Sequence, residues 1–191
     1  MGRAIRQPSL RMRAKRHLAS LARLATETCR TLRGVRQLTP TDASPEAGRR
    51  YPRRPLVGVG AILLDGDRIL MAQRGKEPLK GWWSLPGGAL ETGESLAEGV
   101  RRETREETGL EIEPLGVIEI FERIMRDAAG AAEYHYVLID YVCRITGGQL
   151  AAGDDVCRVE WVRRSDLSKL QITEGTLGVI EKAFRQRRKF R

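Results

Sequence analysis

Between residues 55 and 165 the chain alternates short apolar stretches with turn sequences, a pattern typical of β-strands joined by tight connections. Strands are predicted over residues 56–64, 68–74, 111–126 (as one strand or two), 133–145 and 157–163. The sequence Asp65-Gly66-Asp67 favours a hairpin between the first two strands, because Gly and Asp tolerate the backbone conformations of tight turns.

Two other stretches have the helical period. Residues 94–108 combine good helix formers with an apolar repeat and are followed by a glycine, a common helix stop. Residues 173–188 repeat apolar side chains at helical spacing, with Leu177, Ile180 and Phe184 predicted to face inward. Strands that alternate with helices predict an α/β fold with a mixed sheet between helices, an α/β/α sandwich.

The helix predicted over residues 94–108 carries acids on the face that should meet the sheet. Wound at about 100° per residue, Glu103 and Glu107 fall in line with Val100 and point inward, and Glu106 lies beside them. Clustered carboxylates that face the protein body repel one another and lose hydration, which is costly unless a cation offsets it. Glutamate oxygens suit Mg²⁺ or Mn²⁺, which bind substrate phosphates with their remaining positions. The alternative is a solvated helix with many salt bridges, since RRETREE is typical of such helices.

A glycine-rich loop, residues 86–94, leads into this helix. Its glycines allow the backbone to come close to a ligand, so that a loop carbonyl can complete a metal coordination shell. Glu94 at the end of the loop and Arg102 on the helix are expected to pair, which would hold the loop against the helix.

The segment from Gly88 to Leu110 resembles the Nudix box, G-x5-E-x7-R-E-U-x-E-E-x-G-U, where U is a bulky aliphatic residue. The matching residues are Gly88, Glu94, Arg102, Glu103, Glu106, Glu107, Gly109 and Leu110. The one departure is Thr104 at the first U position, and Thr is close to Val in shape. The lead-in GWWSLPGG and the strand exit LMAQRG also look like this family, so the resemblance covers about residues 55–188.

The resemblance implies a Nudix-type hydrolase that cuts a diphosphate linked to a moiety X, usually in a nucleoside derivative. Carried over by box position, Glu103, Glu106 and Glu107 would be ligands of Mg²⁺, or of Mn²⁺, and the Gly87 carbonyl is a further candidate ligand. Arg102, together with Glu94, would shape the site.

Three further residues are weighed for roles in this site. The general base is Glu103 or a carboxylate from a later loop, for which Asp155 is the candidate; the alternative for Asp155 is ordinary turn chemistry. Arg74 leaves a strand near the box loop and either contacts phosphate or is a solvated strand end. Trp83 either stacks on a base or covers the edge of the sheet.

The resemblance leaves the substrate open. ADP-ribose, cut to AMP and ribose 5-phosphate, is the first expectation, because the strand and box layout looks like the ADP-ribose pyrophosphatase-like members. The alternatives are a nucleoside triphosphate pyrophosphohydrolase that cleanses the nucleotide pool, and a non-catalytic module that binds nucleotide or RNA. Relatives often form homodimers. Cys143 and Cys157 lie in predicted strands and are expected to be small core residues of a cytoplasmic protein.

The basic charge is confined to the start of the chain. Residues 1–40 hold ten Lys or Arg and one acid, which accounts for the whole formal charge of +9. Residues 1–50 are therefore interpreted as a basic extension and linker, and residues 51–191 as the Nudix domain. A basic amphipathic helix is predicted over residues 11–36, so nucleic acid or an anionic membrane would be contacted only through the extension; a poorly ordered tail is the alternative.

Overall fold

The structure is a computed structural model that describes residues 48–153 and 155–190. The helix predicted over residues 11–36 lies outside these residues, as do nearly all of the basic extension and the contacts with nucleic acid or membrane assigned to it. Within the described residues, neither α-helix has the length and apolar character needed to cross a bilayer.

The strands and helices follow the predicted order. They are β1 (Leu56–Asp65), β2 (Arg68–Arg74), β3 (Trp83–Ser84), β4 (Gly87–Ala89), α2 (Leu96–Thr108), β5 (Leu110–Arg126), β6 (Ala132–Gly148), β7 (Val156–Arg163), the 3₁₀-helix η2 (Arg164–Lys169), α3 (Thr176–Gln186) and the 3₁₀-helix η3 (Arg187–Phe190). All five predicted strands are confirmed, and so are the helices predicted over residues 94–108 and 173–188. The short strands β3 and β4 were not predicted.

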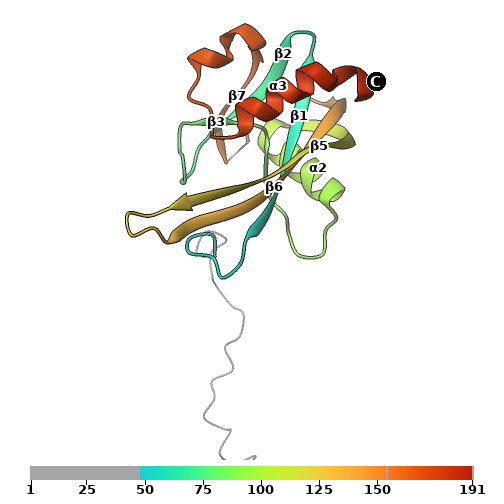
Figure 1. The fold of residues 1–191 in the computed structure, drawn as a ribbon. Helices are drawn as coiled ribbons and strands as arrows, with labels where there is room; N and C mark the ends of the chain where they lie inside the picture. Colours follow the sequence, from blue (N-terminus) through green and yellow to red (C-terminus); the bar gives the residue numbers. More distant parts are fainter. Residues whose placement is uncertain (1–47, 154, 191) are drawn as a thin grey trace, which may run out of the picture. The chain divides into compact units, whose positions relative to one another are not determined.

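The sheet is mixed, as predicted. Strand β1 runs parallel to β6 over its length and antiparallel to β2 and β4. Strands β5 and β6 form a long antiparallel hairpin with several register shifts, and β2 also pairs with β3 and β7. Figure 1 shows the β5–β6 hairpin extending beyond the rest of the sheet.

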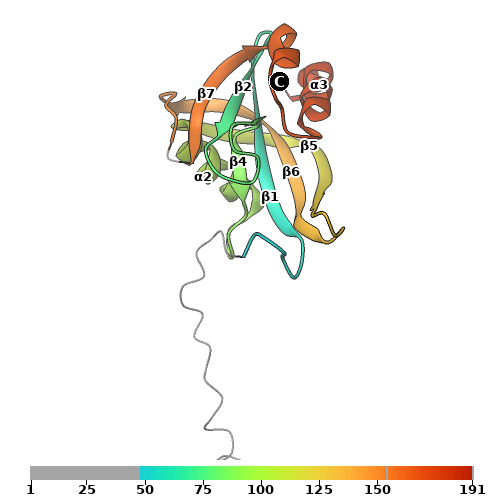
Figure 2. The same cartoon turned by 90° about the vertical axis from the view of Figure 1, so that its left-hand side faces the viewer.

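Two hydrophobic cores lie on opposite faces of the sheet, because neighbouring side chains of β1 point to opposite sides. Ile62 belongs to the core under α3, together with Ile180. Ala61 and Leu63 belong to the core under α2, together with Val100. Figure 2 shows α2 and α3 on either side of the strands, which confirms the predicted α/β/α sandwich.

Helix α2 begins two residues later than predicted because Ser95 caps it. The Ser95 side chain accepts a hydrogen bond from the Glu98 amide, and the Glu98 carboxylate accepts one from the Ser95 amide at 2.8 Å. The helix ends at Gly109, whose φ of 70° is left-handed. Thr104 is fully buried, as its box position requires, although its hydroxyl has no hydrogen-bond partner among the described residues.

Two expectations about the core were wrong. Leu177 is 45% exposed, and the inward face of α3 is formed by Val179, Ile180 and Phe184. This helix starts later than predicted, after Gly175 with its φ of 82°, a backbone conformation that a helix cannot include. Cys157 is exposed, like its neighbour Arg158 on β7, whereas Cys143 is buried as expected.

Candidate active site

The glycine-rich loop and α2 meet through Gly87 and Gly88. The Gly87 amide donates a hydrogen bond to Glu107 Oε2 at 2.8 Å. Gly87 has a φ of 148°, and a Cβ there would lie 2.1 Å from the Val59 carbonyl oxygen. A Cβ on Gly88 would lie 2.4 Å from Glu103 Oε2. A side chain at Gly87 would therefore push the loop away from β1, and one at Gly88 would displace the Glu103 carboxylate.

Arg102 connects the loop to the helix. Its guanidinium donates to both carboxylate oxygens of Glu94, at 2.7 and 3.1 Å, which confirms the predicted ion pair. It also donates to the Ala89 carbonyl at 3.1 Å. The Arg102 guanidinium lowers the pKa of Glu94. The same Arg102 reaches Glu103 at 2.9 Å and Glu106 at 3.2 Å. One cation thus holds three of the box carboxylates.

The box acids differ in burial. The pKa of Glu107 is raised to about 8, mainly by burial and also by the nearby charge of Glu103. Burial also raises the pKa of Glu103, whose side chain is 15% exposed, although Arg102 opposes the shift. Both carboxylates are turned inward, as predicted. Glu106, which was predicted to lie beside them, has a side chain that is 55% exposed at the rim of the site.

The donor set fits a divalent cation. Glu107 is a largely buried acid whose one hydrogen bond in the described structure comes from an amide, so its carboxylate has no paired cation. Beside it, Glu103 shares Arg102 with Glu94 and Glu106. Oxygen donors of this kind suit Mg²⁺ or Mn²⁺. Within the described part of the chain no three acidic, His or Cys side chains converge as a ready cage, because Arg102 draws two of the glutamates toward itself.

Asp155 lies at the edge of this acidic group. Its side chain is 61% exposed and accepts a hydrogen bond from Lys76 Nζ at 2.5 Å. It is nevertheless close enough for its charge to raise the pKa of Glu107. The backbone carbonyl of Asp155 accepts from the Gly75 amide at 3.1 Å, which joins the turn before β7 to the end of β2.

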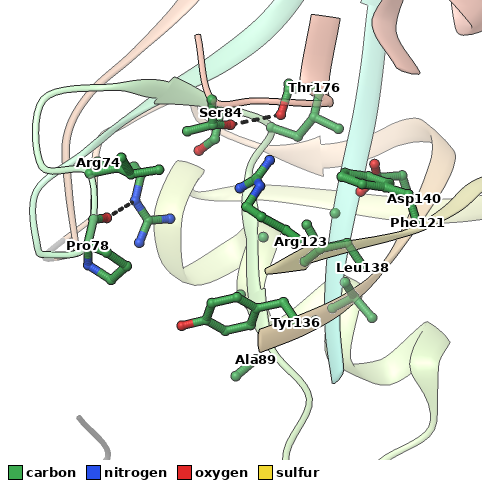
Figure 3. A pocket seen from close by; sticks show the side chains of 18 of the residues that line it. Arg74, Pro78, Ser84, Ala89, Phe121, Arg123, Tyr136, Leu138, Asp140 and Thr176 are labelled. Atoms are coloured by element: carbon green, nitrogen blue, oxygen red, sulfur yellow. Dashed lines mark hydrogen bonds between the residues drawn. The ribbon is translucent and has the colours of Figure 1, made fainter. Parts of the chain in front are cut away.

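A pocket opens next to the loop on the α3 side of the sheet. Its wall near the loop is formed by the backbone of residues 87–89. The side chains that line it include Arg49, Arg74, Phe121, Arg123, Tyr136, Leu138 and Asp140. Figure 3 shows Arg74 and Arg123 extending into the same space from different strands, with the Tyr136 ring beside Arg123. Arg74 is held by its Nε–H bond to the Pro78 carbonyl at 2.8 Å. Of its two sequence interpretations, the pocket position favours a phosphate contact.

Trp83 is not in this pocket. It is 6% exposed and belongs to the core under α3, and the Arg158 guanidinium lies over its ring at 5.9 Å. The packing therefore favours the structural alternative for Trp83 over base stacking.

The sequence analysis did not single out the charged pocket residues Arg49, Arg123 and Asp140, nor Tyr136 beside them. The sequence does contain one sign that Asp140 is unusual, because it is the only acid within the apolar run YVLIDYV. The strand β1 opposite it reads LVGVG, and its two glycines leave room beside β6. Arg49 had no comparable signal, since it lies in the stretch interpreted as a linker.

Comparison with known proteins gives three kinds of match. A family model described as NUDIX domain matches residues 54–182. The chain is 36% identical over 116 residues to ADP-ribose pyrophosphatase from Methanocaldococcus jannaschii, which covers 61% of this chain and 66% of that protein. It is 33% identical over 119 residues to 8-oxo-dGDP phosphatase from Mus musculus, which covers 60% of this chain and 34% of that protein. It resembles the crystal structure of the MutT NUDIX hydrolase from Burkholderia pseudomallei with a TM-score of 0.60 at 29% identity, covering 68% and 98% of the two chains.

Proposed function

The chain belongs to the Nudix hydrolase family, and we propose that it uses Mg²⁺ to hydrolyse a nucleoside diphosphate that is linked to a further group. The substrate that we expect first is ADP-ribose. The observation that carries this proposal is the placement of the buried acids Glu103 and Glu107 against the glycine loop, beside a pocket lined with arginines. The likeness to an ADP-ribose pyrophosphatase at 36% identity supports ADP-ribose.

In this proposal each residue of the site has a defined task. Glu103, Glu106, Glu107 and the Gly87 carbonyl would hold the metal ion. When bound, the ion supplies positive charge to the diphosphate oxygens and lowers the pKa of a water molecule. Arg102 keeps the loop and the carboxylates in register through its bonds to Glu94 and Ala89.

The pocket side chains bind and orient the substrate. Arg74 and Arg123 present guanidinium groups to the diphosphate and its attached groups, where planar donors suit phosphate oxygens. Between the two candidates for the general base, we favour Glu103, because Asp155 is mostly exposed and is held by Lys76. A partly buried carboxyl with a raised pKa is well suited to accept a proton from water near neutral pH.

A second candidate function is the hydrolysis of an oxidised nucleotide. The likeness to an 8-oxo-dGDP phosphatase at 33% identity and to a MutT hydrolase structure favours it. A non-catalytic nucleotide- or RNA-binding module is the third candidate. The presence of every box glutamate argues against that module, because such modules have no need of a metal site.

The decisive experiment is a substrate panel with identified products. The full-length protein is incubated with ADP-ribose, dinucleotides, deoxynucleoside triphosphates and 8-oxo-dGDP, with Mg²⁺ and with a chelator. We expect AMP and ribose 5-phosphate from ADP-ribose, and no turnover with the chelator. Faster hydrolysis of 8-oxo-dGDP than of ADP-ribose would favour the second candidate function, the hydrolysis of an oxidised nucleotide. No turnover of any compound would contradict the proposed activity.

The variant Glu106→Gln tests the metal site itself. Because this side chain is mostly exposed, its loss should leave the melting temperature nearly unchanged. Turnover should fall on the order of a hundredfold, since a carboxylate ligand becomes a neutral amide. The matched control is Glu122→Gln, an exposed acid of β5, which should keep wild-type turnover. Full activity of Glu106→Gln would refute the role proposed for this residue.

A further inference from the structure

Asp140 is a buried acid without a hydrogen-bonding partner for one of its oxygens. It lies on β6, is 4% exposed, and lines the pocket. Its Oδ2 has no partner among the described residues. Buried polar atoms are nearly always hydrogen-bonded, because an unpaired one loses its hydration without compensation. Because Asp140 also lines the pocket, this unmet acceptor points to a ligand that reaches the carboxyl group and supplies the missing donor.

The strand opposite leaves space for this carboxyl group. A Cβ on Gly60 would lie 2.2 Å from Asp140 Oδ1, and a Cβ on Gly58 would lie 2.8 Å from Leu138 Cδ2. Phe121 adds an aromatic ring to the same wall, as Figure 3 shows. Flat apolar surfaces with one acid at the end suit a planar heterocycle that carries N–H groups on its edge.

Arg123 adds a second unpaired group. Its Nε is buried without a partner among the described residues, while its terminal nitrogen donates to the Glu174 carbonyl. Both groups line the pocket, and the charge of Arg123 lowers the pKa of Asp140.

The position of Asp140 relative to the loop fits a nucleotide. Gly87 of β4 pairs with Gly60 of β1, and Gly60 pairs with Asp140 of β6. Two strand spacings separate Gly87 from Asp140, which is about 10 Å across the sheet. A nucleotide whose phosphates lie against the loop at Gly87 can extend its base by roughly this distance.

We infer that Asp140 binds the hydrogen-bonding edge of a purine base and sets the base preference of the enzyme. The inference rests on the proposed function, since it takes the pocket as the nucleoside site. An ionised carboxylate is a double acceptor and matches the N1–H and N2–H donors of guanine. A protonated carboxyl is a donor and an acceptor, and matches N1 and the N6 amino group of adenine.

The surroundings of Asp140 allow both forms near neutral pH. Burial is the main cause and raises the pKa of Asp140 to about 7, while Arg123 lowers it and Glu119 raises it. Glu119 is the β5 neighbour of Asp140 in the sheet and is itself bound by Lys182 of α3 at 2.7 Å. Gly60 faces Asp140 from β1 and carries no charge. The preference should therefore shift from adenine toward guanine as the pH rises.

The test compares two substrates that differ only in the base. We would measure kcat/KM of the full-length protein for ADP-ribose and for its guanine counterpart, from about pH 6 to about pH 8. The ratio of the two values cancels any titration of the metal site, which both substrates share. In the wild type the adenine-to-guanine ratio should fall by at least about tenfold across this range.

Asp140→Asn keeps the shape of the side chain and removes its titration. An amide is a donor and an acceptor, so this variant should prefer adenine at every pH. Asp166→Asn, an exposed acid paired with Lys169 outside the pocket, is the matched control and should keep the wild-type ratio and its pH dependence. A wild-type ratio that does not change with pH would overturn the inference, and so would an unchanged pH dependence in Asp140→Asn.

A binding measurement separates this inference from the proposed activity. Calorimetric titration of the wild-type protein with AMP and with GMP needs neither turnover nor a variant. AMP should bind more tightly at about pH 6 and GMP should gain at about pH 8. If neither diphosphate substrate is hydrolysed but this exchange is observed, the activity is wrong and the role of Asp140 stands. Equal pH dependence for both nucleotides would overturn the role of Asp140.

Discussion

At the scale of single residues, the site combines acids that are stabilised in different ways. Glu94 is held by two hydrogen bonds from Arg102, which keeps it charged. Glu107 and Asp140 are buried, and burial raises the pKa of both. A buried carboxyl group destabilises the folded state when it ionises, because its charge loses hydration. Such groups are therefore found mostly where a bound ligand or metal ion interacts with the charge.

Asp140 should therefore make the stability of the protein depend on pH. Its pKa is about 7 in the folded state, against about 3.9 in an unfolded chain. The stabilisation from its bound proton is complete below about pH 4 and is lost as the pH rises through about 7. Asp140→Asn removes the loss, so the variant should gain stability relative to the wild type at about pH 8, by about 4 kcal/mol at most.

Denaturant unfolding at about pH 4 and about pH 8 measures this effect. The gain of the variant should be present at the higher pH and absent at the lower one. Asp166→Asn again serves as control, and it should lose rather than gain stability, because Lys169 lowers the pKa of Asp166 and stabilises its charged form. An equal effect of Asp140→Asn at both pH values would show that its carboxyl does not titrate between them.

The box residues could be assigned from the sequence because their positions depend on one helix alone. The helical period places Glu103 and Glu107 beside Val100 whatever the rest of the chain does. Asp140 and Arg123 could not be assigned in this way. Their presence in one pocket depends on the register of β5 against β6, and that register shifts several times along the hairpin.

At the scale of secondary structure, α2 is the platform of the site. Its first turn is closed by the Ser95–Glu98 capping box, and its last turn by Gly109. The acids that face the loop lie between these two ends. A helix that frays at its first turn would loosen Arg102 and hence the loop that Arg102 binds.

Ser95→Ala tests whether the capped first turn of α2 is needed to hold the site residues in place. Removing the capping hydroxyl should cost about 1 kcal/mol of stability, because an amide of the first turn loses its acceptor. Turnover should fall by a few-fold at a temperature well below the melting point, since Glu103 and Arg102 become less fixed. Ser165→Ala is the control, because Ser165 is an exposed serine of η2, away from α2. Unchanged stability of Ser95→Ala would show that the cap is not needed.

The strands differed in how well they could be predicted. Long strands such as β1 and β6 have enough residues for an apolar pattern to be recognised. Strands β3 and β4 have two and three residues, too few for any period, and they form only because β2 and β1 lie beside them. The loop that carries the site is therefore more ordered than its glycines suggested.

At the scale of the whole molecule, the basic extension and the catalytic unit differ in charge, and the boundary between them matters for function. The composition placed that boundary at residue 50. Arg50 and Tyr51, the two residues at that boundary, both contact the β5–β6 hairpin. The Tyr51 amide donates to the Glu133 carbonyl at 2.7 Å, and the Tyr51 hydroxyl donates to Asp127 at 2.9 Å. Arg50 pairs with Glu133 at 2.9 Å.

These contacts fix the segment on the β5–β6 hairpin and bring Arg49 to the pocket wall. Burial raises the pKa of Glu103 and of Tyr136 there, and the charge of Arg49 opposes that rise in both groups. A cation in this position should attract a diphosphate substrate. The chain outside the described residues begins immediately before this segment, at residue 47.

Two truncations that differ by four residues should therefore behave differently. Deletion of residues 1–47 should leave kcat/KM on a small substrate within a few-fold of the full-length value. Deletion of residues 1–51 also removes Arg49, Arg50 and Tyr51. The loss of Arg49 should raise KM several-fold, and the loss of the contacts of Arg50 and Tyr51 should lower the melting temperature. Arg49→Ala in the full-length chain separates the two effects. It should raise KM, while the contacts of Arg50 and Tyr51 should leave the melting temperature unchanged. Equal KM values for both truncations would show that the segment before β1 takes no part in substrate binding.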